Sequence, residues 1–268
     1  MRVATWNIRS AIGPGPFPDR WWSRIDADRL RAIGSFIGDM DADVIALQEV
    51  ALLSRDGDLV DNAGDLARQL GMHVRFAAVR TFEVMENGDL LGVGCFGNAL
   101  LSRLSFGTSH TFALPAASAV ALVEPADAGL PGAGLRYADA PSSIREPRCL
   151  LLADVGSLAV GSAHFSHIGS GERLLQAEAT VAAFADRSPS VLLGDLNAPI
   201  SASELAPFAG WTDAFTGPED DAARISTDAG ARIDHVLALG ASVTDCRVAR
   251  EAGDLSDHFP LLAEVEPA

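Results

Sequence analysis

The sequence predicts an α/β fold in which two β-sheets pack face to face and carry helices on their outer faces. Short apolar runs of strand length recur along the 268 residues and outnumber the helical patterns. Two such runs, at 149–155 and 158–165, are joined by the tight turn Gly156-Ser157, which indicates a hairpin and argues against a purely parallel sheet. Apolar residues make up 48% of the chain, which is ample for a sizeable core.

The N-terminal part is predicted to start with a strand, followed by an amphipathic helix. In that helix Leu30, Ile33 and Ile37 fall on one side, as the 3.6-residue period of a helix requires. A second helix is predicted to close at Gly71, where a left-handed residue is wanted. The expected elements are strands at 2–8, 44–47, 73–79 and 99–102, and helices at 24–40 and 61–70.

The C-terminal part is predicted to contain one helix, at 172–185, and several further strands. Residues 124–144 are rich in Pro, Gly, Ala and Asp, and we interpret them as a loop insertion rather than a domain linker. Nothing marks a second domain, so a single domain over 1–268 is predicted. The later strands are expected near 190–194, 233–238, 243–249 and 260–266.

Charge narrows the class of partner. The net charge is −16, and all 20 basic residues are arginines. A protein that binds a long polyanion normally carries a basic face, and here the arginines are scattered singly. The charge therefore disfavours an extended nucleic acid, without excluding a local arginine cluster.

The cysteines and the N-terminus indicate the compartment. Cys95, Cys149 and Cys246 are odd in number, far apart and without zinc spacing, which suits a reducing environment. Strand pattern begins at once, with no basic-then-apolar leader, so we expect a cytoplasmic protein unless a leader was removed. No apolar run reaches the ~18 residues of a membrane span. The sequence leaves the oligomeric state open, with a monomer as the expectation.

The most informative run is Val191-Leu192-Leu193-Gly194-Asp195-Leu196-Asn197. Its apolar residues predict a buried strand, which Gly194 is expected to end. Asp195 and Asn197, two apart, can then point out of the same strand end. The acid is a candidate to activate water or to carry the leaving-group proton, and the amide to hold a phosphate. The alternative is a turn or helix cap that uses both side chains for local hydrogen bonds.

Other strand ends carry complementary chemistry. Asn7 and Glu49 each follow an apolar strand and are candidate ligands for a hard cation. His164 follows another strand and is a candidate donor to a phosphoryl oxygen. Taken singly, each has a plainer interpretation: a turn-starting Asn, a solvated strand end and a structural histidine.

Two segments near the C-terminus explain one another. Asp234 precedes one apolar strand, and Asp257-His258 precedes the next. A carboxylate can fix the tautomer of a histidine and raise its basicity, so Asp234 is expected to orient His258 while Asp257 holds a metal. Phosphoryl transfer needs these parts together: cation ligands, an acid–histidine pair and amides for the oxygens. The absence of thiolate ligands favours Mg²⁺ or Mn²⁺ over zinc.

These segments resemble the endonuclease/exonuclease/phosphatase superfamily, which includes DNase I-like nucleases, abasic-site endonucleases, sphingomyelinases and inositol polyphosphate 5-phosphatases. They occur in the order of the family and span nearly the whole chain. The matching segments are Thr5-Trp6-Asn7-Ile8, Ile45-Ala46-Leu47-Gln48-Glu49, Gly97-Asn98-Ala99-Leu100-Leu101-Ser102-Arg103, Ala163-His164-Phe165, Gly194-Asp195-Leu196-Asn197, Arg232-Ile233-Asp234-His235 and Ser256-Asp257-His258-Phe259-Pro260.

The resemblance implies a four-layer α/β/β/α sandwich with the site at one edge of the paired sheets. It implies that Asn7, Glu49 and Asp257 surround the principal magnesium, and that Asp195 and Asn197 act on the nucleophile and the phosphate. It also implies a catalytic dyad of His258 and Asp234, with His164 contacting phosphate. Whether His258 is a base or a transition-state stabiliser stays open.

Softer correspondences concern four more side chains. Arg148 and Asn98 are expected to face the substrate phosphate; the alternatives are a surface arginine, with Arg145 as a competitor, and a turn asparagine. Arg173 and Gln176 are candidates to reach the site from a helix start, and a solvated helix face is an equal alternative.

The departures from the family concern DNA-binding features. Cys95-Phe96 stands where abasic-site endonucleases carry a tyrosine, and basic DNA-gripping loops are missing. We therefore predict a metal-dependent phosphoester hydrolase for a small or accessible substrate. The alternatives are a DNA or RNA nuclease and, less favoured, a non-catalytic phosphate-binding module. Specificity is expected to reside in loops at 9–22, 51–62, 80–96 and 124–146.

Overall fold

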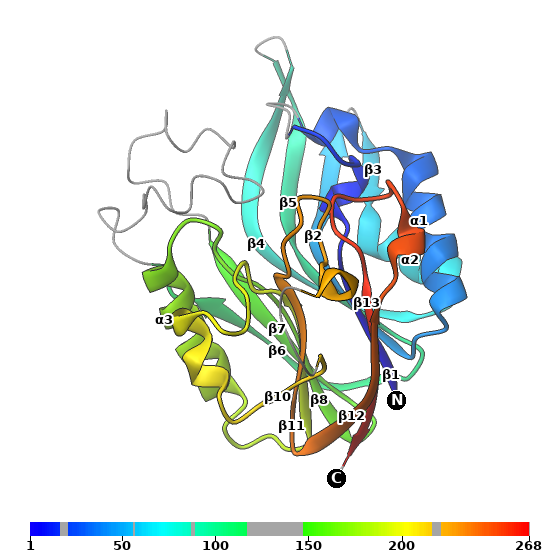
Figure 1. Ribbon diagram of the computed structural model, residues 1–268. Helices are drawn as coiled ribbons and strands as arrows, with labels where there is room; N and C mark the ends of the chain where they lie inside the picture. Colours follow the sequence, from blue (N-terminus) through cyan, green and yellow to red (C-terminus); the bar gives the residue numbers. More distant parts are fainter. Residues whose placement is uncertain (17–20, 56, 87–88, 117–146, 216–220, 268) are drawn as a thin grey trace.

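The computed structural model describes residues 1–16, 21–55, 57–86, 89–116, 147–215 and 221–267. It has the predicted four-layer architecture, with two mixed sheets face to face between outer helices (Figure 1). The first sheet has the order β12-β13-β1-β2-β5-β4, with β3 beside β2, and the second has the order β10-β11-β9-β8-β7-β6. The first sheet contains β1 (Arg2–Asn7), β2 (Val44–Arg55), β3 (Asp58–Asp61), β4 (His73–Glu86), β5 (Asp89–Ser102), β12 (Ala241–Val248) and β13 (Leu261–Pro267). The second contains β6 (Phe106–Leu114), β7 (Arg148–Val155), β8 (Leu158–His164), β9 (Ser190–Asp195), β10 (Thr212–Asp213) and β11 (Asp234–Leu239).

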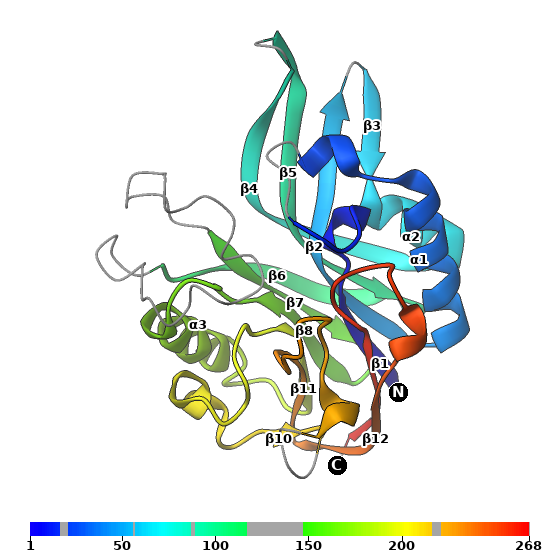
Figure 2. The ribbon, with the colours of Figure 1, turned by 45° about the horizontal axis from the view of Figure 1, so that its top comes forward.

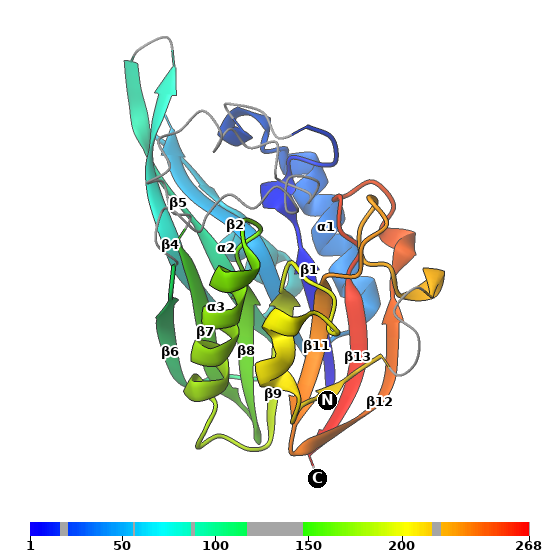
Figure 3. The same ribbon diagram turned by 60° about the vertical axis from the view of Figure 1, so that its left-hand side comes forward.

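Helices cover the outer face of each sheet. Helices α1 (Ala27–Met40) and α2 (Asn62–Leu70) cover the first sheet, and α3 (Ser170–Ala183) covers the second together with the 3₁₀-helix η5 (Ser203–Phe208) (Figure 3). Three buried apolar clusters fill the interfaces between the four layers. No described helix is long and apolar enough to cross a membrane.

The helix ends follow from capping residues. The Asp26 side chain accepts hydrogen bonds from the backbone N–H groups of Asp28 and Arg29, so α1 begins at Ala27 rather than at residue 24. Gly71 closes α2 with a φ of 66°, as predicted, because glycine enters the left-handed region without steric cost.

Two of the predicted loops are strands. Residues 51–55 continue β2 and residues 58–61 return as β3. Residues 80–86 and 89–96 form the outer part of the β4–β5 hairpin, which projects beyond the rest of the first sheet (Figure 2). Glycines made 80–96 resemble a loop, yet they permit close contacts within the hairpin. A Cβ on Gly94 would lie 2.6 Å from the Phe82 ring, and one on Gly97 would lie 1.9 Å from the carbonyl oxygen of Ala77.

Strand β6 was not predicted either. Its residues are largely exposed, so the sequence shows no apolar alternation there. The predicted insertion at 124–144 lies outside the described residues.

Candidate active site

On the second sheet, strand register brings three polar side chains into one row. Strand β8 runs parallel to β9 and pairs His164 with Asp195, while β11 runs antiparallel and pairs Asp234 with Asp195. All three side chains are buried. Gly194 does not end the strand as predicted but lies inside β9, where a Cβ would lie 2.0 Å from the carbonyl oxygen of Ala163. The glycine allows β8 and β9 to approach, which keeps the row close.

On the first sheet, Glu49 reaches the site through a β-bulge. Between the pairs formed by Leu47 and Val50, the two residues Gln48 and Glu49 of β2 oppose the single residue Asn98 of β5. Glu49 has a φ of 55°, a left-handed conformation that costs energy for a non-glycine residue. Bulges of this kind redirect side chains next to active sites. The bulge therefore turns Glu49 toward the row on the second sheet.

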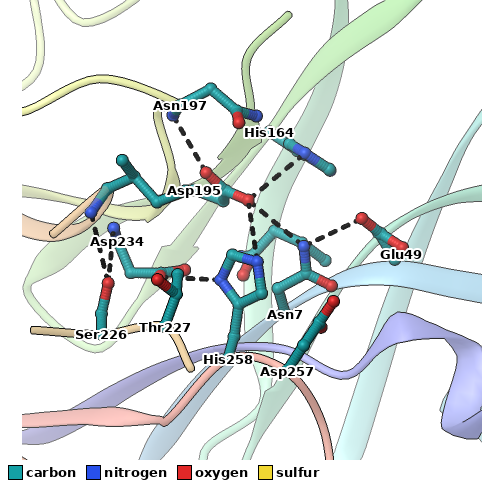
Figure 4. Close-up of polar contacts among 12 residues, drawn as sticks. Asn7, Glu49, His164, Asp195, Asn197, Ser226, Thr227, Asp234, Asp257 and His258 are labelled. Atoms are coloured by element: carbon teal, nitrogen blue, oxygen red, sulfur yellow. Dashed lines mark hydrogen bonds and ion pairs between the residues drawn. The ribbon is translucent and has the colours of Figure 1, made fainter. Parts of the chain in front are cut away.

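Asn7 joins the two sheets at the site. Its side-chain amide nitrogen donates to Glu49 Oε1 at 3.0 Å and to Asp195 Oδ2 at 3.2 Å (Figure 4). Its Oδ1 accepts a hydrogen bond from the backbone N–H of Arg9 at 3.1 Å. In this arrangement Asn7 presents its nitrogen to the carboxylates and acts as a bridge between them. Its role as a metal ligand stays a prediction.

His258 and Asp234 form the predicted pair. The Nδ1 atom of His258 lies 2.8 Å from Asp234 Oδ2, and its Nε2 faces Asp195 Oδ2 at 3.8 Å. Ser226 Oγ accepts the backbone N–H of Asp234, and Thr227 forms a β-bridge with His258, so the segment around 226 supports both partners. The contact is present, and its catalytic role stays a prediction.

Burial and charge shift the proton affinities of this cluster. Burial, reinforced by the charge of Asp234, raises the pKa of Asp195 to about 7, against the opposing charge of His258. Burial alone would lower the pKa of His258, but the charge and hydrogen bond of Asp234 outweigh it and hold that pKa well above 6.5. The raised pKa of His258 favours its imidazolium form, and a pKa of about 7 places Asp195 close to its titration point at neutral pH.

The opposite side of the site is suited to a cation. Burial and the neighbouring charge of Asp257 raise the pKa of Glu49, so the two carboxylates repel each other. The Nε atom of Arg9 lies 3.3 Å from Asp257 Oδ2 and partly offsets this repulsion. An oxygen-only pair of repelling carboxylates fits a hard divalent cation.

A second group of potential ligands lies nearby. Asp195, Asp234 and His258 present ligand atoms within 4.8 Å of one another. The bond between His258 Nδ1 and Asp234 already uses one of these atoms. The predicted ligand set of Asn7, Glu49 and Asp257 therefore stays a prediction.

Asn197 links the two strand ends of the second sheet. Its backbone N–H donates to Asp195 Oδ1 at 2.9 Å, and its side-chain amide donates to the carbonyl of Phe165 at 3.0 Å. Its φ of 51° is again left-handed. The local hydrogen bonds of the turn interpretation are thus present within the site itself, and a phosphate contact from Asn197 stays a prediction.

The softer correspondences are buried residues whose described contacts run to other partners. Asn98 is buried between the sheets and donates to the carbonyl of Cys149 at 3.0 Å. Arg148 is buried, with its Nη2 3.4 Å from Nδ1 of His167. The described contacts of these two predicted phosphate ligands run to neither Asp195 nor His258. Arg145 lies outside the described residues.

Arg173 and Gln176 support the site from behind and do not lie on a solvated helix face. Arg173 is buried and donates to Glu204 Oε1 from Nε and Nη2, at 3.0 and 2.8 Å, and to the carbonyl of Ser166 from Nη1. Gln176 Oε1 accepts the backbone N–H of Ser166 at 2.8 Å. Both therefore hold the segment that follows His164.

Sequence reasoning missed Arg9, Ser226 and Gln48. Arg9 directly follows the Thr5-Trp6-Asn7-Ile8 segment, and its nearness to a candidate ligand was the available signal. Ser226 carried none, because it acts through backbone groups brought near by a long connection. Gln48 is fully buried at the bulge, a place that the strand pattern did not reveal.

Comparison with solved structures supports the fold. An endonuclease/exonuclease/phosphatase from Beutenbergia cavernae DSM 12333 superposes with a TM-score of 0.72 at 22% identity, covering 100% of this chain and 71% of that one. The mannosyl-6-phosphatase Bt3783 of Bacteroides thetaiotaomicron VPI-5482 gives a TM-score of 0.61 at 18% identity, covering 99% of both chains. The human Nocturnin catalytic domain, solved with bound sulfate, gives 0.61 at 16% identity, covering 99% of this chain and 93% of the other.

Sequence comparison adds the family. No curated protein sequence matches the chain. The model of the Endonuclease/Exonuclease/phosphatase family, however, matches residues 4–258, from β1 to the histidine of the dyad. This match covers every polar strand end described above and agrees with the resemblance drawn from the motifs. The chain belongs to the Endonuclease/Exonuclease/phosphatase family.

Proposed function

We propose that the protein is a divalent-metal-dependent phosphoester hydrolase that acts on a small or locally accessible phosphoester. The observation that carries the proposal is the meeting of two chemistries in one cluster. A repelling carboxylate pair, Glu49 and Asp257, lies on one side of Asn7, and a histidine–aspartate pair lies on the other. Family membership supports hydrolysis of phosphoester bonds as the reaction class.

The residues of the chain divide the work of the reaction. A divalent cation bound at Glu49 and Asp257 would supply positive charge to the phosphoryl oxygens. Protonated His258 donates a hydrogen bond to a phosphoryl oxygen as negative charge develops there, and Asp234 keeps its ring oriented. Asp195, which titrates near neutrality, accepts the proton of the attacking water, while the bond from phosphorus to the leaving-group oxygen breaks and that oxygen takes its proton from solvent. Asn197 and His164 orient the phosphate beside it.

Charge supports a small or accessible substrate. A net charge of −16 repels a long polyanion, and two described arginines near the site, Arg9 and Arg173, are already engaged with Asp257 and Glu204. Among the similar folds, one solved protein is described as a mannosyl-6-phosphatase. A phosphomonoester on a small polar group is therefore a suitable first probe, beside a generic phosphodiester.

The test measures how turnover depends on a divalent metal and on the carboxylate of Asp195. Hydrolysis of 4-nitrophenyl phosphate and of bis(4-nitrophenyl) phosphate is measured with Mg²⁺, with Mn²⁺ and with EDTA. We expect EDTA to abolish turnover and Asp195→Asn to lower it by about a hundredfold or more. Asp154→Asn is the matched control, since Asp154 pairs with Arg187 at the other end of the strands. Full activity of Asp195→Asn, or activity in EDTA, would contradict the mechanism.

Nucleic acid tests the substrate class. Plasmid DNA and short single strands are incubated with the protein across a range of salt concentrations. We expect little cleavage, with no steep dependence on salt. Efficient cleavage that falls steeply with salt would show that the charge argument is wrong and that the protein is a nuclease.

A further inference from the structure

The chain leaves β1 through an unusual backbone segment. Arg9, Ser10 and Ala11 have φ values of 48°, 50° and 61°, so three consecutive non-glycine residues lie in the left-handed region. Each costs on the order of 1 kcal/mol or more, and such strain persists only where the surroundings hold it. The Ser10 hydroxyl donates to the carbonyl of Glu49 at 2.7 Å, which fastens this segment to the bulge.

The strained segment directs Arg9 back into the site. Its guanidinium is fixed at two points, with Nε 3.3 Å from Asp257 Oδ2 and Nη1 donating to the carbonyl of Gly13 at 2.9 Å. Its backbone N–H donates to Asn7 Oδ1, and its charge acts on Glu49. Arg9 is only 7% exposed. A permanent positive charge thus lies beside Asp257 and acts on Glu49, the two carboxylates among the predicted metal ligands.

We propose that Arg9 is a built-in electrostatic competitor of the divalent cation, which weakens metal binding at Glu49 and Asp257 and keeps the ion exchangeable. The inference rests on the proposed function, because it needs a cation at that pair. An arginine keeps its charge at any physiological pH, so its repulsion of the metal is constant. In a largely buried site this repulsion is weakly screened by water or salt.

Removal of Arg9 should also have an opposite effect on metal affinity, because Arg9 helps to hold the two carboxylates in place when no metal is bound. Arg9 offsets the repulsion between Glu49 and Asp257 when no metal is bound, so its removal also leaves the carboxylates less well held. The backbone hydrogen bond to Asn7 survives any side-chain change. A divalent ion carries twice the charge of the guanidinium. We therefore expect the affinity gained by removing the repulsion of the metal to exceed the affinity lost because the carboxylates are less well held.

The test is direct measurement of metal affinity, independent of turnover. Mn²⁺ and Mg²⁺ are titrated calorimetrically into the EDTA-stripped full chain at constant pH and ionic strength. Arg9→Met and Arg9→Gln remove the charge, and Arg9→Lys retains it. Arg187→Met is the matched control, because it removes one arginine from an ion pair at the far end of the strands. Circular dichroism establishes that each variant is folded.

We expect Arg9→Met and Arg9→Gln to bind Mn²⁺ about tenfold more tightly than wild type. Arg9→Lys and Arg187→Met should stay close to wild type. Unchanged or weaker binding in whichever charge-removing variant folds overturns this inference alone, as long as the wild type binds metal. Failure of the wild type to bind any divalent ion overturns both this inference and the proposed function.

Discussion

The two sides of the site differ in how they handle charge. The cation side, comprising Asn7, Glu49 and Asp257 with Arg9, is partly open, and the Asp257 side chain is 17% exposed. Asp257 pairs with a guanidinium and Glu49 accepts a hydrogen bond from the Asn7 amide, and neither of these donors titrates near neutral pH. Under the proposed function, a cation from solvent must reach this side, and the partial exposure of Asp257 agrees with such a route.

The proton side, comprising His164, Asp195, Asp234 and His258, is almost completely buried. The ring of His258 lies between the carboxylates of Asp195 and Asp234, so its positive charge offsets their negative charge. Asp257 and His258 are adjacent in sequence yet contact different sides, Asp257 through Arg9 and His258 through Asp234. Under the proposed function, the difference means that one site separates proton chemistry from cation chemistry, and Asn7 bonds to carboxylates of both sides.

The largest expected effect comes from the proton side. His258→Gln should lower kcat by on the order of a thousandfold, because it removes the imidazolium beside the phosphate. Metal affinity should not weaken, since the cation side keeps its ligands. The measurement pairs steady-state kinetics with a Mn²⁺ titration.

His235→Gln is the control for this change. His235 is also buried on β11, and its Nε2 atom lies 2.8 Å from the carbonyl oxygen of Ala198. As the next residue along the strand, it points to the opposite face of the sheet from Asp234. Its variant should keep most of the turnover. Equal losses in the two variants would mean that the His258 effect is structural.

Much of the fold follows from the sequence, because apolar periodicity records burial. Strands buried on both faces, such as β1 and β9, were predicted to within about a residue. The outer part of the β4–β5 hairpin, which the sequence indicated as a loop at 80–96, and β6 were not, because their residues are glycine-rich or exposed and apolar periodicity fails there. Strand pattern detects what the core requires, and these segments lie largely outside the core.

The residues of the site also divide into those that the sequence predicts and those that it does not. Residues at the ends of buried strands, such as Glu49 and Asp195, were identified because an acid after an apolar run is conspicuous. The β-bulge and the left-handed run at Arg9 were not, because they depend on contacts with distant segments. Sequence thus identified the groups that are proposed to do the chemistry, and the structure identified the residues that position them.

The cation side should respond to metal concentration. Glu49→Gln should weaken Mg²⁺ binding by about a hundredfold and leave kcat near wild type once Mg²⁺ is raised to saturation, because the proton side is intact. Titration of activity against Mg²⁺ measures both. Glu178→Gln, on the exposed face of α3, is the matched control. A kcat that stays low at saturating metal would mean that Glu49 also acts in the chemical step.

The pH dependence of the free energy of unfolding should report on the titration of Asp195. Its pKa of about 7 in the folded protein exceeds the 3.8 of an ordinary aspartate, so the folded state binds the extra proton and loses stability as pH rises between these values. Between pH 4.5 and pH 6.5, Asp195→Asn should therefore lose less stability than wild type, by roughly 2 kcal/mol. Urea unfolding in EDTA measures this difference. Identical slopes would place the pKa of Asp195 outside this window.

The smallest expected effect concerns the alignment of the two sides. Gln48 is fully buried between the sheets, accepts the Thr5 hydroxyl at Oε1 at 3.2 Å, and donates from Nε2 to Ser162 Oγ at 3.3 Å. It therefore ties β2, which carries Glu49, to β8, which carries His164. Gln48→Met keeps the length of the side chain but leaves both hydroxyls without this partner, at a cost of about 1–3 kcal/mol.

Because Gln48 touches no reacting group, its loss should act on geometry alone. We expect kcat to fall by up to about tenfold while KM and metal affinity stay close to wild type, since small misplacements of catalytic groups slow the chemical step. Ser162→Ala removes only the bond between the sheets, so a double-mutant cycle with Gln48→Met should show strong coupling. Additive effects on kcat would mean that apolar packing between the sheets aligns the two sides and that the Gln48 bond does not.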